Sequence, residues 1–344
     1  MQTTLKRGAL FLLAALNVQF TTAHASSTIN STNHHAWSGN TGWIDFRPER
    51  PDAGDGFTFG EFSCGGWLWS PNIGWINCGD GSPANGVQYA NDGSADFGVN
   101  HTGTGNLYGL AWAPNIGWIN FGWSYLEPTN SARPRVNLAT GEFSGYAWSA
   151  NCGWISLGTG QLKTDRMNIT DTDGDGISDV FEMGYTGSLT NMTATSDTDG
   201  DEQSDKAEYI AMTNPMNPNS ALKITRLSRL PEVNSVEMEW ASSPARVYDI
   251  EAKLSLTDTN WLYLDTVSGA AGASTAQAID MGPPQAFFRV GVKLPLEPGS
   301  PTSLQGRCGA THRPFLSVRV CANRTPLCVG RAVNGSNKTA TMLA

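Results

Sequence analysis

The sequence predicts a mainly β protein. It comprises an antiparallel β domain built from a tryptophan-rich repeat, a small loop module with short helices, and a C-terminal β-sandwich. Charged residues make up only 15% of the 344 residues, whereas glycine (38) and tryptophan (12) are abundant. This composition disfavours long solvated helices and favours tight turns. One Trp-containing pattern recurs four times in the first half, and short runs of alternating apolar and polar residues follow in the last third.

Length and charge limit the organisation and the partners of the chain. A length of 344 residues suits two or three domains. The net charge of −9 argues against nucleic acid as a partner, because phosphate binding needs a cationic face. We expect a signal peptide at 1–25, a Trp-repeat domain at 26–162, an acidic module at 165–220, a β-sandwich at 221–294 and a disordered tail at 295–344.

The first segment has the features of a secretory signal peptide. Lys6 and Arg7 precede an apolar run, and Ala23-His24-Ala25 fits a small-x-small cleavage site. The run is shorter than the roughly 20 apolar residues that a bilayer requires, so an uncleaved anchor is the weaker alternative. We therefore expect no membrane span in the mature chain and a secreted or cell-surface location, extracellular or periplasmic, where disulfides form.

Each of the four repeats predicts a β-hairpin. The segments 36–46, 68–78, 111–121 and 147–157 each carry two Trp residues that flank turn-forming Ser, Pro, Asn or Gly residues. The first Trp residues are spaced 32, 43 and 36 apart, which indicates a stacked or radially repeated architecture. The pattern resembles the GYAWSENIGWI repeats of many exported bacterial proteins. This resemblance implies export and a repeat, but no particular activity.

The second hairpin suggests a disulfide. If its turn is centred on Pro71, Trp67 pairs with Trp75 and Cys64 faces Cys78. Directly opposed residues have Cβ atoms about 4.5–5.5 Å apart, close to what a disulfide requires. We predict a Cys64–Cys78 bridge; two separate buried thiols are the alternative.

Strand alternation assigns the tryptophans to one face and the core residues to the other. Leu68 and Ile76 share the core side with the two cysteines of this hairpin. Indoles beside small polar residues suit the stacking of sugars. Their recurrence in every repeat instead favours a packing role of one repeat against the next, because a binding site usually breaks the symmetry of a repeat. The candidate ligand face comprises Trp67, Trp75, Trp112, Trp118, Trp148 and Trp154.

The acidic module contains two loops with the spacing of calcium ligands. In each, oxygen donors occupy positions 1, 3, 5, 9 and 12 of a twelve-residue segment, and the second begins 26 residues after the first. Calcium binds six to eight oxygens, which one such loop can supply. The predicted Ca²⁺ ligands are Asp171, Asp173, Asp175, Asp179, Glu182, Asp197, Asp199, Asp201, Asp205 and Glu208, with the backbone carbonyls of Ile177 and Gln203.

Position six distinguishes the two loops. Gly176 fits the sharp turn there, whereas the second loop has Glu202, whose left-handed conformation costs about 1 kcal/mol. We therefore expect weaker binding in the second loop. The alternatives are a solvated acidic linker and Mg²⁺, which keeps its waters more tightly. The segment resembles bacterial thrombospondin type 3-like calcium repeats, with Glu202 and the Asn residues of the 213–218 tail as departures. The resemblance implies a structural spacer.

The last third predicts a small sandwich followed by a tail. Alternating segments at 235–240, 246–250, 261–264 and 286–290 are separated by turn residues, as in immunoglobulin- or fibronectin-like domains. This part resembles a C-terminal domain common in exported bacterial proteins with calcium repeats.

The tail holds Cys308, Cys321 and Cys328. With His312 these match no common zinc-finger spacing, and the sequence indicates no pairing for them or for Cys152.

No catalytic motif was found. The histidines that follow the leader share no recognisable catalytic context, and His34 and His35 are expected in a ragged N-terminus. The primary hypothesis is a non-enzymatic, calcium-binding structural or adhesive protein whose partner is a cell-surface glycan or matrix protein. One alternative is a carbohydrate-binding protein that uses the Trp faces, and a second is an unrecognised secreted hydrolase. The sequence indicates no oligomeric state.

Overall fold

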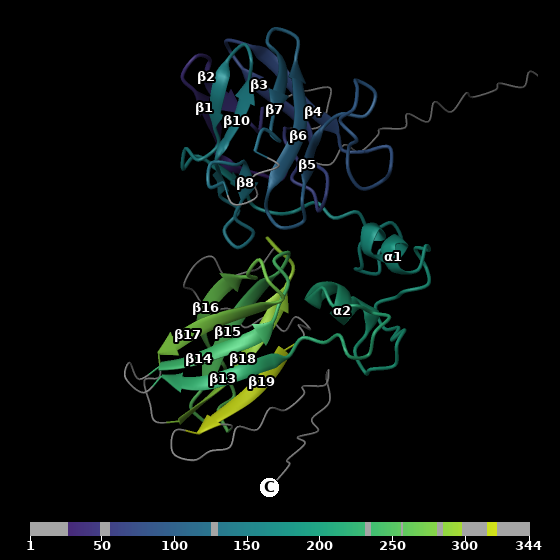
Figure 1. The fold of residues 1–344 in the computed structure, drawn as a ribbon, viewed down its shortest axis with the longest axis vertical. Helices are drawn as coiled ribbons and strands as arrows, with labels where there is room; N and C mark the ends of the chain where they lie inside the picture. Colours follow the sequence, from purple (N-terminus) through teal and green to yellow (C-terminus); the bar gives the residue numbers. More distant parts are fainter. Residues whose placement is uncertain are drawn as a thin grey trace, which may run out of the picture.

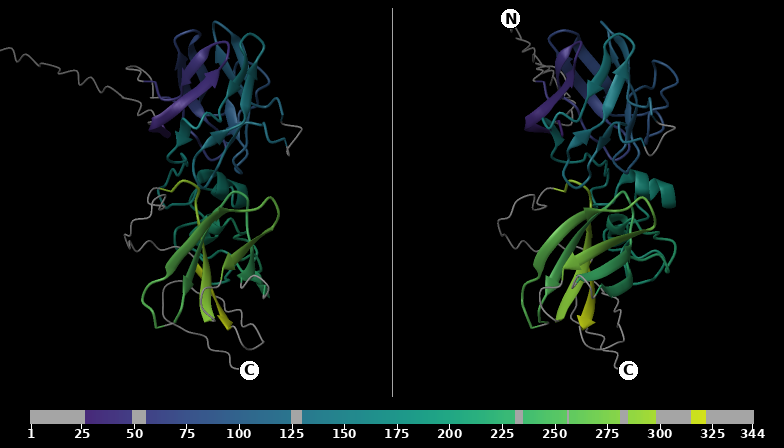
Figure 2. Two further views of the ribbon diagram at one scale, coloured as in Figure 1. Left: turned by 90° about the vertical axis from the view of Figure 1, so that its left-hand side faces the viewer. Right: turned by 60° about the vertical axis from the view of Figure 1, so that its left-hand side comes forward.

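The computed structural model describes residues 27–48, 56–124, 130–230, 235–255, 257–280, 285–297 and 315–321. The predicted signal peptide lies outside them. A β-barrel and a β-sandwich lie at opposite ends of the molecule, and a module with two short helices lies beside the junction between them (Figures 1 and 2). The prediction of a mainly β, antiparallel protein is confirmed. In the described part of the chain, neither helix has the length and apolar character needed to cross a bilayer.

The four Trp segments each form one hairpin, and the hairpins close into an antiparallel barrel of eight strands. Closure comes from pairing between the last strand and the first. The barrel strands are β1 (Ile29–Ser38), β2 (Gly42–Asp45), β3 (Gly65–Ser70), β4 (Gly74–Asp80), β6 (Leu107–Ala113), β7 (Gly117–Asn120), β10 (Tyr146–Ser149) and β11 (Gly153–Ser156). The shorter strands are β5 (Val99–His101), β8 (Arg135–Val136), β9 (Phe143–Ser144) and β12 (Leu162–Thr164).

The side chains at alternating positions along each strand fill the interior of the barrel. Each hairpin contributes one cross-strand pair to the interior, and every member of these pairs is at most 3% exposed. An alanine faces the isoleucine in three of the four pairs, which lets the side chains fit inside a narrow barrel. The inward pairs are Ala36 with Ile44, Leu68 with Ile76, Ala111 with Ile119 and Ala147 with Ile155. The predicted division into a core face and a Trp face is therefore confirmed.

A ring of asparagines joins the four hairpin turns. Each Nδ2 donates to a backbone carbonyl of a neighbouring turn, at 2.9–3.1 Å. The donors and acceptors are Asn40 to Cys152, Asn72 to Thr41, Asn115 to Ile73 and Asn151 to Ile116. The bond from Asn40 connects the first turn with the last. The ring of side-chain hydrogen bonds therefore closes between the same two hairpins whose strands, β1 and β11, close the barrel.

The register of the second hairpin differs from the prediction. Trp69, rather than Trp67, pairs with Trp75, because the turn lies one residue further along the chain than expected. An irregularity between Gly65 and Trp67 shifts the register again beyond that point. Gly66 has a φ of +95° there, and a Cβ on it would lie 2.0 Å from the carbonyl oxygen of Gly56.

The predicted Cys64–Cys78 disulfide is not formed. Both cysteines are free and fully buried in the barrel core, as is Cys152. The displaced turn explains the difference, because a turn one residue later already moves Cys64 away from Cys78, and the irregularity adds a further shift. The alternative of separate buried thiols describes the structure.

The acidic module has little apolar core of its own. Its helices α1 (Asp179–Tyr185) and α2 (Asp205–Ala211) are each seven residues long. Ser178 and Ser204 cap them, accepting hydrogen bonds from backbone N–H groups three residues later. The buried apolar cluster of the module consists of Ile177, Phe181, Met192 and Tyr209. Such a small cluster leaves the loops dependent on other interactions for their stability.

The C-terminal domain is the predicted two-sheet sandwich, with Trp240 fully buried between the sheets. One sheet has the order β13-β14-β17 and the other β16-β15-β18-β19. The strands are β13 (Ile224–Leu230), β14 (Ser235–Ala241), β15 (Val247–Lys253), β16 (Leu262–Ser268), β17 (Ser274–Asp280), β18 (Gln285–Lys293) and β19 (Phe315–Cys321).

Strand β19 lies within the segment 295–344 that the sequence analysis predicted to be a disordered tail. It pairs with β18 over seven residues and forms an edge of the sandwich. The rest of the tail beyond Glu297, including Cys308 and Cys328, lies outside the described residues.

Candidate metal centre

The first acidic loop brings three carboxylates together. One oxygen from each of Asp171, Asp173 and Asp175 lies within 4.8 Å of the others. Hydrogen bonds from the loop backbone orient these side chains. The N–H groups of Gly174 and Gly176 donate to the two oxygens of Asp171 at 2.8 and 2.9 Å. Backbone donors thus fold the loop around a cluster of negative charge.

Glu182, on α1, lies close enough to this cluster to feel the charges of its aspartates. Its side chain is 0% exposed, and neither carboxylate oxygen has a hydrogen-bond partner among the described residues. Burial, followed by the charges of Asp173, Asp175, Asp179 and Asp171, raises the pKa of Glu182 to about 7. A buried carboxylate with no donor is costly unless a cation compensates it, so the arrangement fits a calcium ligand that offers both oxygens.

The second loop repeats this geometry. One oxygen from each of Asp197, Asp199 and Asp201 lies within 4.8 Å of the others. Glu208, on α2, is 0% exposed; its Oε1 accepts from the Thr213 hydroxyl at 3.1 Å, while its Oε2 has no partner among the described residues. Burial raises the pKa of Glu208 to about 8, and the neighbouring aspartates contribute. The second loop therefore also fits a cation.

The two aspartates at position nine are held by the threonines at position two. Both oxygens of Asp179 accept hydrogen bonds from Thr172, from its N–H at 2.7 Å and its hydroxyl at 2.6 Å. Asp205 accepts the same pair of bonds from Thr198, at 3.0 and 2.7 Å. These bonds close the loops. Coordination of an ion by these carboxylates, which for Asp179 is expected either directly or through water, stays a prediction.

The residues at position six, Gly176 and Glu202, share the left-handed backbone conformation that the sequence analysis expected there. Gly176 has a φ of +90° and Glu202 a φ of +74°, so both loops need the left-handed conformation there. Lys206, on α2, donates from Nζ to the carbonyl of Asp175 at 2.8 Å and thereby connects the two loops. Ile177 and Gln203 donate their N–H groups to Asp175 and Asp201, both at 2.8 Å. Coordination through their carbonyls stays a prediction.

The predicted ligand face of the barrel is exposed. Its Trp pairs flank the hairpin turns, and the rings of Trp112 and Trp118 meet edge to face with 4.7 Å between centroids. Trp112, Trp118, Trp148 and Trp154 are 37–50% exposed. Packing of one repeat against the next therefore leaves a substantial part of each indole in contact with solvent. Trp67 and Trp75 are half-buried, and Trp69 takes the expected place of Trp67.

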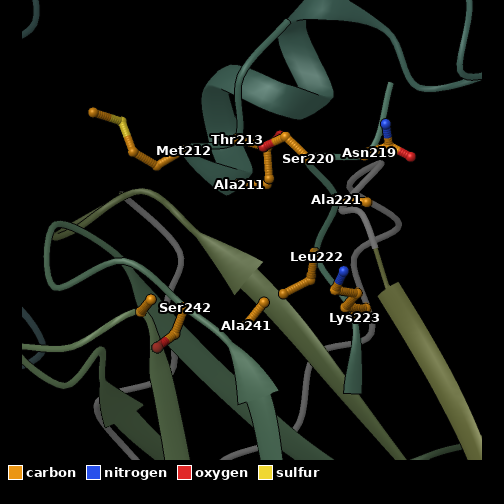
Figure 3. A pocket seen from close by; sticks show the side chains of 11 residues that line it. Ala211, Met212, Thr213, Asn219, Ser220, Ala221, Leu222, Lys223, Ala241 and Ser242 are labelled. Carbon is orange, nitrogen blue, oxygen red and sulfur yellow. The ribbon is translucent and has the colours of Figure 1, made fainter. Parts of the chain in front are cut away.

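A pocket lies between the end of α2 and the sandwich (Figure 3). Its lining consists largely of small and neutral residues, among them Ala211, Thr213, Ser220 and Ser242. Lys223 is the only titratable residue of this lining, and no predicted site residue belongs to it. The pocket therefore offers no pair of groups for acid–base chemistry.

Comparisons of the chain with protein-family models, with curated proteins and with solved structures give no match.

Proposed function

We propose that the chain is an exported, non-enzymatic structural or adhesive protein in which two calcium ions stiffen the joint between a β-barrel and a β-sandwich. The observation that carries this proposal is Glu182, which is wholly buried beside three aspartates and whose two oxygens have no hydrogen-bond partner in the described part of the chain. In an acidic linker without an ion, this carboxylate would turn towards water. A divalent cation with oxygen ligands accounts for its position.

Contacts between the domains support the idea of a joint. Tyr209, adjacent to the predicted ligand Glu208 on α2, donates its hydroxyl to Glu61 of the barrel segment at 3.4 Å. Arg246 of the sandwich, 2% exposed, donates to the backbone carbonyls of Tyr209 and Ile210 at 2.7 and 2.9 Å. One helix thus connects the second loop, the barrel and the sandwich.

Calcium titration by calorimetry tests the proposal. We expect two Ca²⁺ ions per chain, one after Glu182→Gln or Glu208→Gln, and none in the double variant. Glu142→Gln, which changes an exposed glutamate of the barrel domain, is the matched control and should keep two ions. No calcium binding by the folded wild-type chain, or unchanged stoichiometry in the double variant, would contradict the proposal.

Exposure of the tryptophans supports a second candidate, carbohydrate binding by the barrel. The indoles of Trp148 and Trp154 are 39% and 50% exposed, which leaves apolar surface for a sugar ring. Glycan-array binding that is lost on Trp148→Ala, with an unchanged melting temperature, would support this function. If the barrel binds no glycan on the array, carbohydrate binding is rejected and the structural or adhesive role remains the proposed function.

A further inference from the structure

Three side chains with metal-binding groups meet on the outer surface of the barrel, away from the acidic loops. His35 on β1 pairs with Asp45 on β2, so both side chains project from the same face. The Nδ1 atom of His34 lies 2.6 Å from Oδ1 of Asp45, and the two imidazole centroids are 4.0 Å apart. One nitrogen from each histidine and one oxygen of Asp45 lie within 4.8 Å of one another.

Strand β1 is irregular just before this cluster. Adjacent residues of a regular strand point to opposite faces, which would separate His34 from His35. Here β1 also pairs with β12, and the register of that pairing shifts between Ile29 and His34. Backbone hydrogen bonds fix both histidines: the carbonyl of His34 accepts from Phe46 at 2.8 Å, and the N–H of His35 donates to Gln161 at 2.7 Å. The expected ragged N-terminus is therefore an ordered strand at this point.

The charge of Asp45 is available to a ligand. The nearest arginine in sequence, Arg47, directs its guanidinium to the backbone carbonyls of Ser27 and Ile29 instead of to this carboxylate. The backbone N–H of Arg47 donates to Oδ1 of Asp45 at 2.8 Å and orients it. The side chains of His34 and Asp45 are 22% and 23% exposed, so the cluster is held in place yet open to solvent.

We propose that His34, His35 and Asp45 form a binding site for one divalent late transition-metal ion, with Zn²⁺ as the expected occupant. Two imidazole nitrogens and one carboxylate oxygen favour such an ion over Ca²⁺, which takes oxygen ligands. Three protein ligands leave a fourth position for water or an external ligand, and the partial exposure of the cluster gives access to it. The site is independent of the calcium loops, so its failure would leave the proposed function intact.

The hydrogen bond between His34 and Asp45 allows two arrangements of the same site. Asp45 either coordinates the ion directly or orients the His34 ring, whose other nitrogen then coordinates. Loss of an orienting carboxylate weakens binding about 10- to 100-fold, whereas loss of a direct ligand costs more. Asp45→Asn keeps an oxygen to accept the bond from the Arg47 N–H, so the size of its effect on Zn²⁺ affinity separates the two arrangements.

Zinc titration of the full chain in saturating Ca²⁺ tests the proposal, because calcium then occupies the acidic loops. We expect one Zn²⁺ ion bound by the wild type and by the control Asp92→Asn, an exposed aspartate elsewhere in the barrel domain. His34→Ala and His35→Ala should each weaken binding at least about tenfold, and the double variant should bind no zinc. Zinc binding of equal affinity in the double variant, or none in the wild type, overturns the proposal.

Trp43 provides a second readout that does not depend on stoichiometry. Its ring lies 5.9 Å from that of His35, so a paramagnetic Cu²⁺ ion at the site should quench its fluorescence. The quenching should be reversed by a chelator and absent in His35→Ala. If the alanine variants melt well below the wild type, the zinc titration and the copper quenching are compared between the wild type and Asp45→Asn instead. Unchanged affinity for Zn²⁺ and unchanged quenching by Cu²⁺ in that variant also overturn the proposal.

Discussion

Replacing Glu182 by glutamine should change stability in opposite directions with and without calcium. In the ion-free protein, burial and the neighbouring aspartates raise the pKa of Glu182 to about 7. The unfolded chain loses this proton near pH 4.5, so ion-free stability declines as the pH rises from there through 7. Glutamine has nearly the same shape but no charge. The Glu182→Gln variant should therefore be more stable than the wild type in EDTA at pH 8.

Calcium should reverse this order. A ligand at a hundredfold excess over its dissociation constant stabilises the folded state by about 2.7 kcal/mol per site. For a unit of the size of the 165–220 module, each kcal/mol shifts the melting temperature by about 4–8 °C. Loss of the first site should thus lower the melting temperature in calcium by about 10–20 °C relative to the wild type.

Scanning calorimetry at pH 8, in EDTA and in calcium, measures both effects on the same samples. Glu142→Gln controls for the loss of a surface charge and should follow the wild type in both buffers. A Glu182→Gln variant that is destabilised equally in both would show that Glu182 is an ordinary buried polar residue. The reasoning from its unpartnered oxygens would then be refuted.

Three further predictions concern the second loop and the barrel. Glu202→Gly relieves a left-handed conformation with a φ of +74°, worth about 1 kcal/mol, and should tighten calcium binding in the second loop about fivefold in a calorimetric titration. Asn115→Ala removes the bond to the Ile73 carbonyl and should lower the free energy of unfolding in urea by about 1–2 kcal/mol. Burial lowers the pKa of His101 to about 4, so the unfolded chain takes up a proton that the folded chain excludes. Stability of the calcium-loaded protein should therefore fall as the pH drops from about 6.5 towards 4, and His101→Gln should flatten that decline in urea titrations.

The faces of the strands could be predicted from the sequence, but their register could not. Inward and outward positions follow from alternation, which is a local property of a strand. The register depends first on the turn, which lies one residue later than predicted and by itself moves Cys78 away from Cys64. It depends further on Gly66, which the carbonyl of Gly56 approaches closely. That contact joins segments with no pattern in common, and the irregularity there shifts the register once more.

Some features of the site had a signal in the sequence that the prediction did not use. Both acidic loops have threonine at position two, Thr172 and Thr198, and each holds the aspartate at position nine. This repeated threonine explains how each loop holds the carboxylate at position nine. Likewise, all four repeats carry an asparagine at the same place in the turn, which the ring of side-chain hydrogen bonds explains.

The contacts among Glu61, Tyr209 and Arg246 had no such signal, because they join residues that are far apart in sequence. They nevertheless bear on how an ion in a small loop affects the whole molecule. Glu208 and Tyr209 are neighbours on α2, so whatever orders Glu208 also places the Tyr209 ring, which lies 5.3 Å from the guanidinium of Arg246. The module has four buried apolar residues in its own cluster, so we expect bound ions to contribute to holding this helix. In the proposed joint, calcium therefore acts on the domain contacts through one turn of helix rather than through a long pathway of side chains.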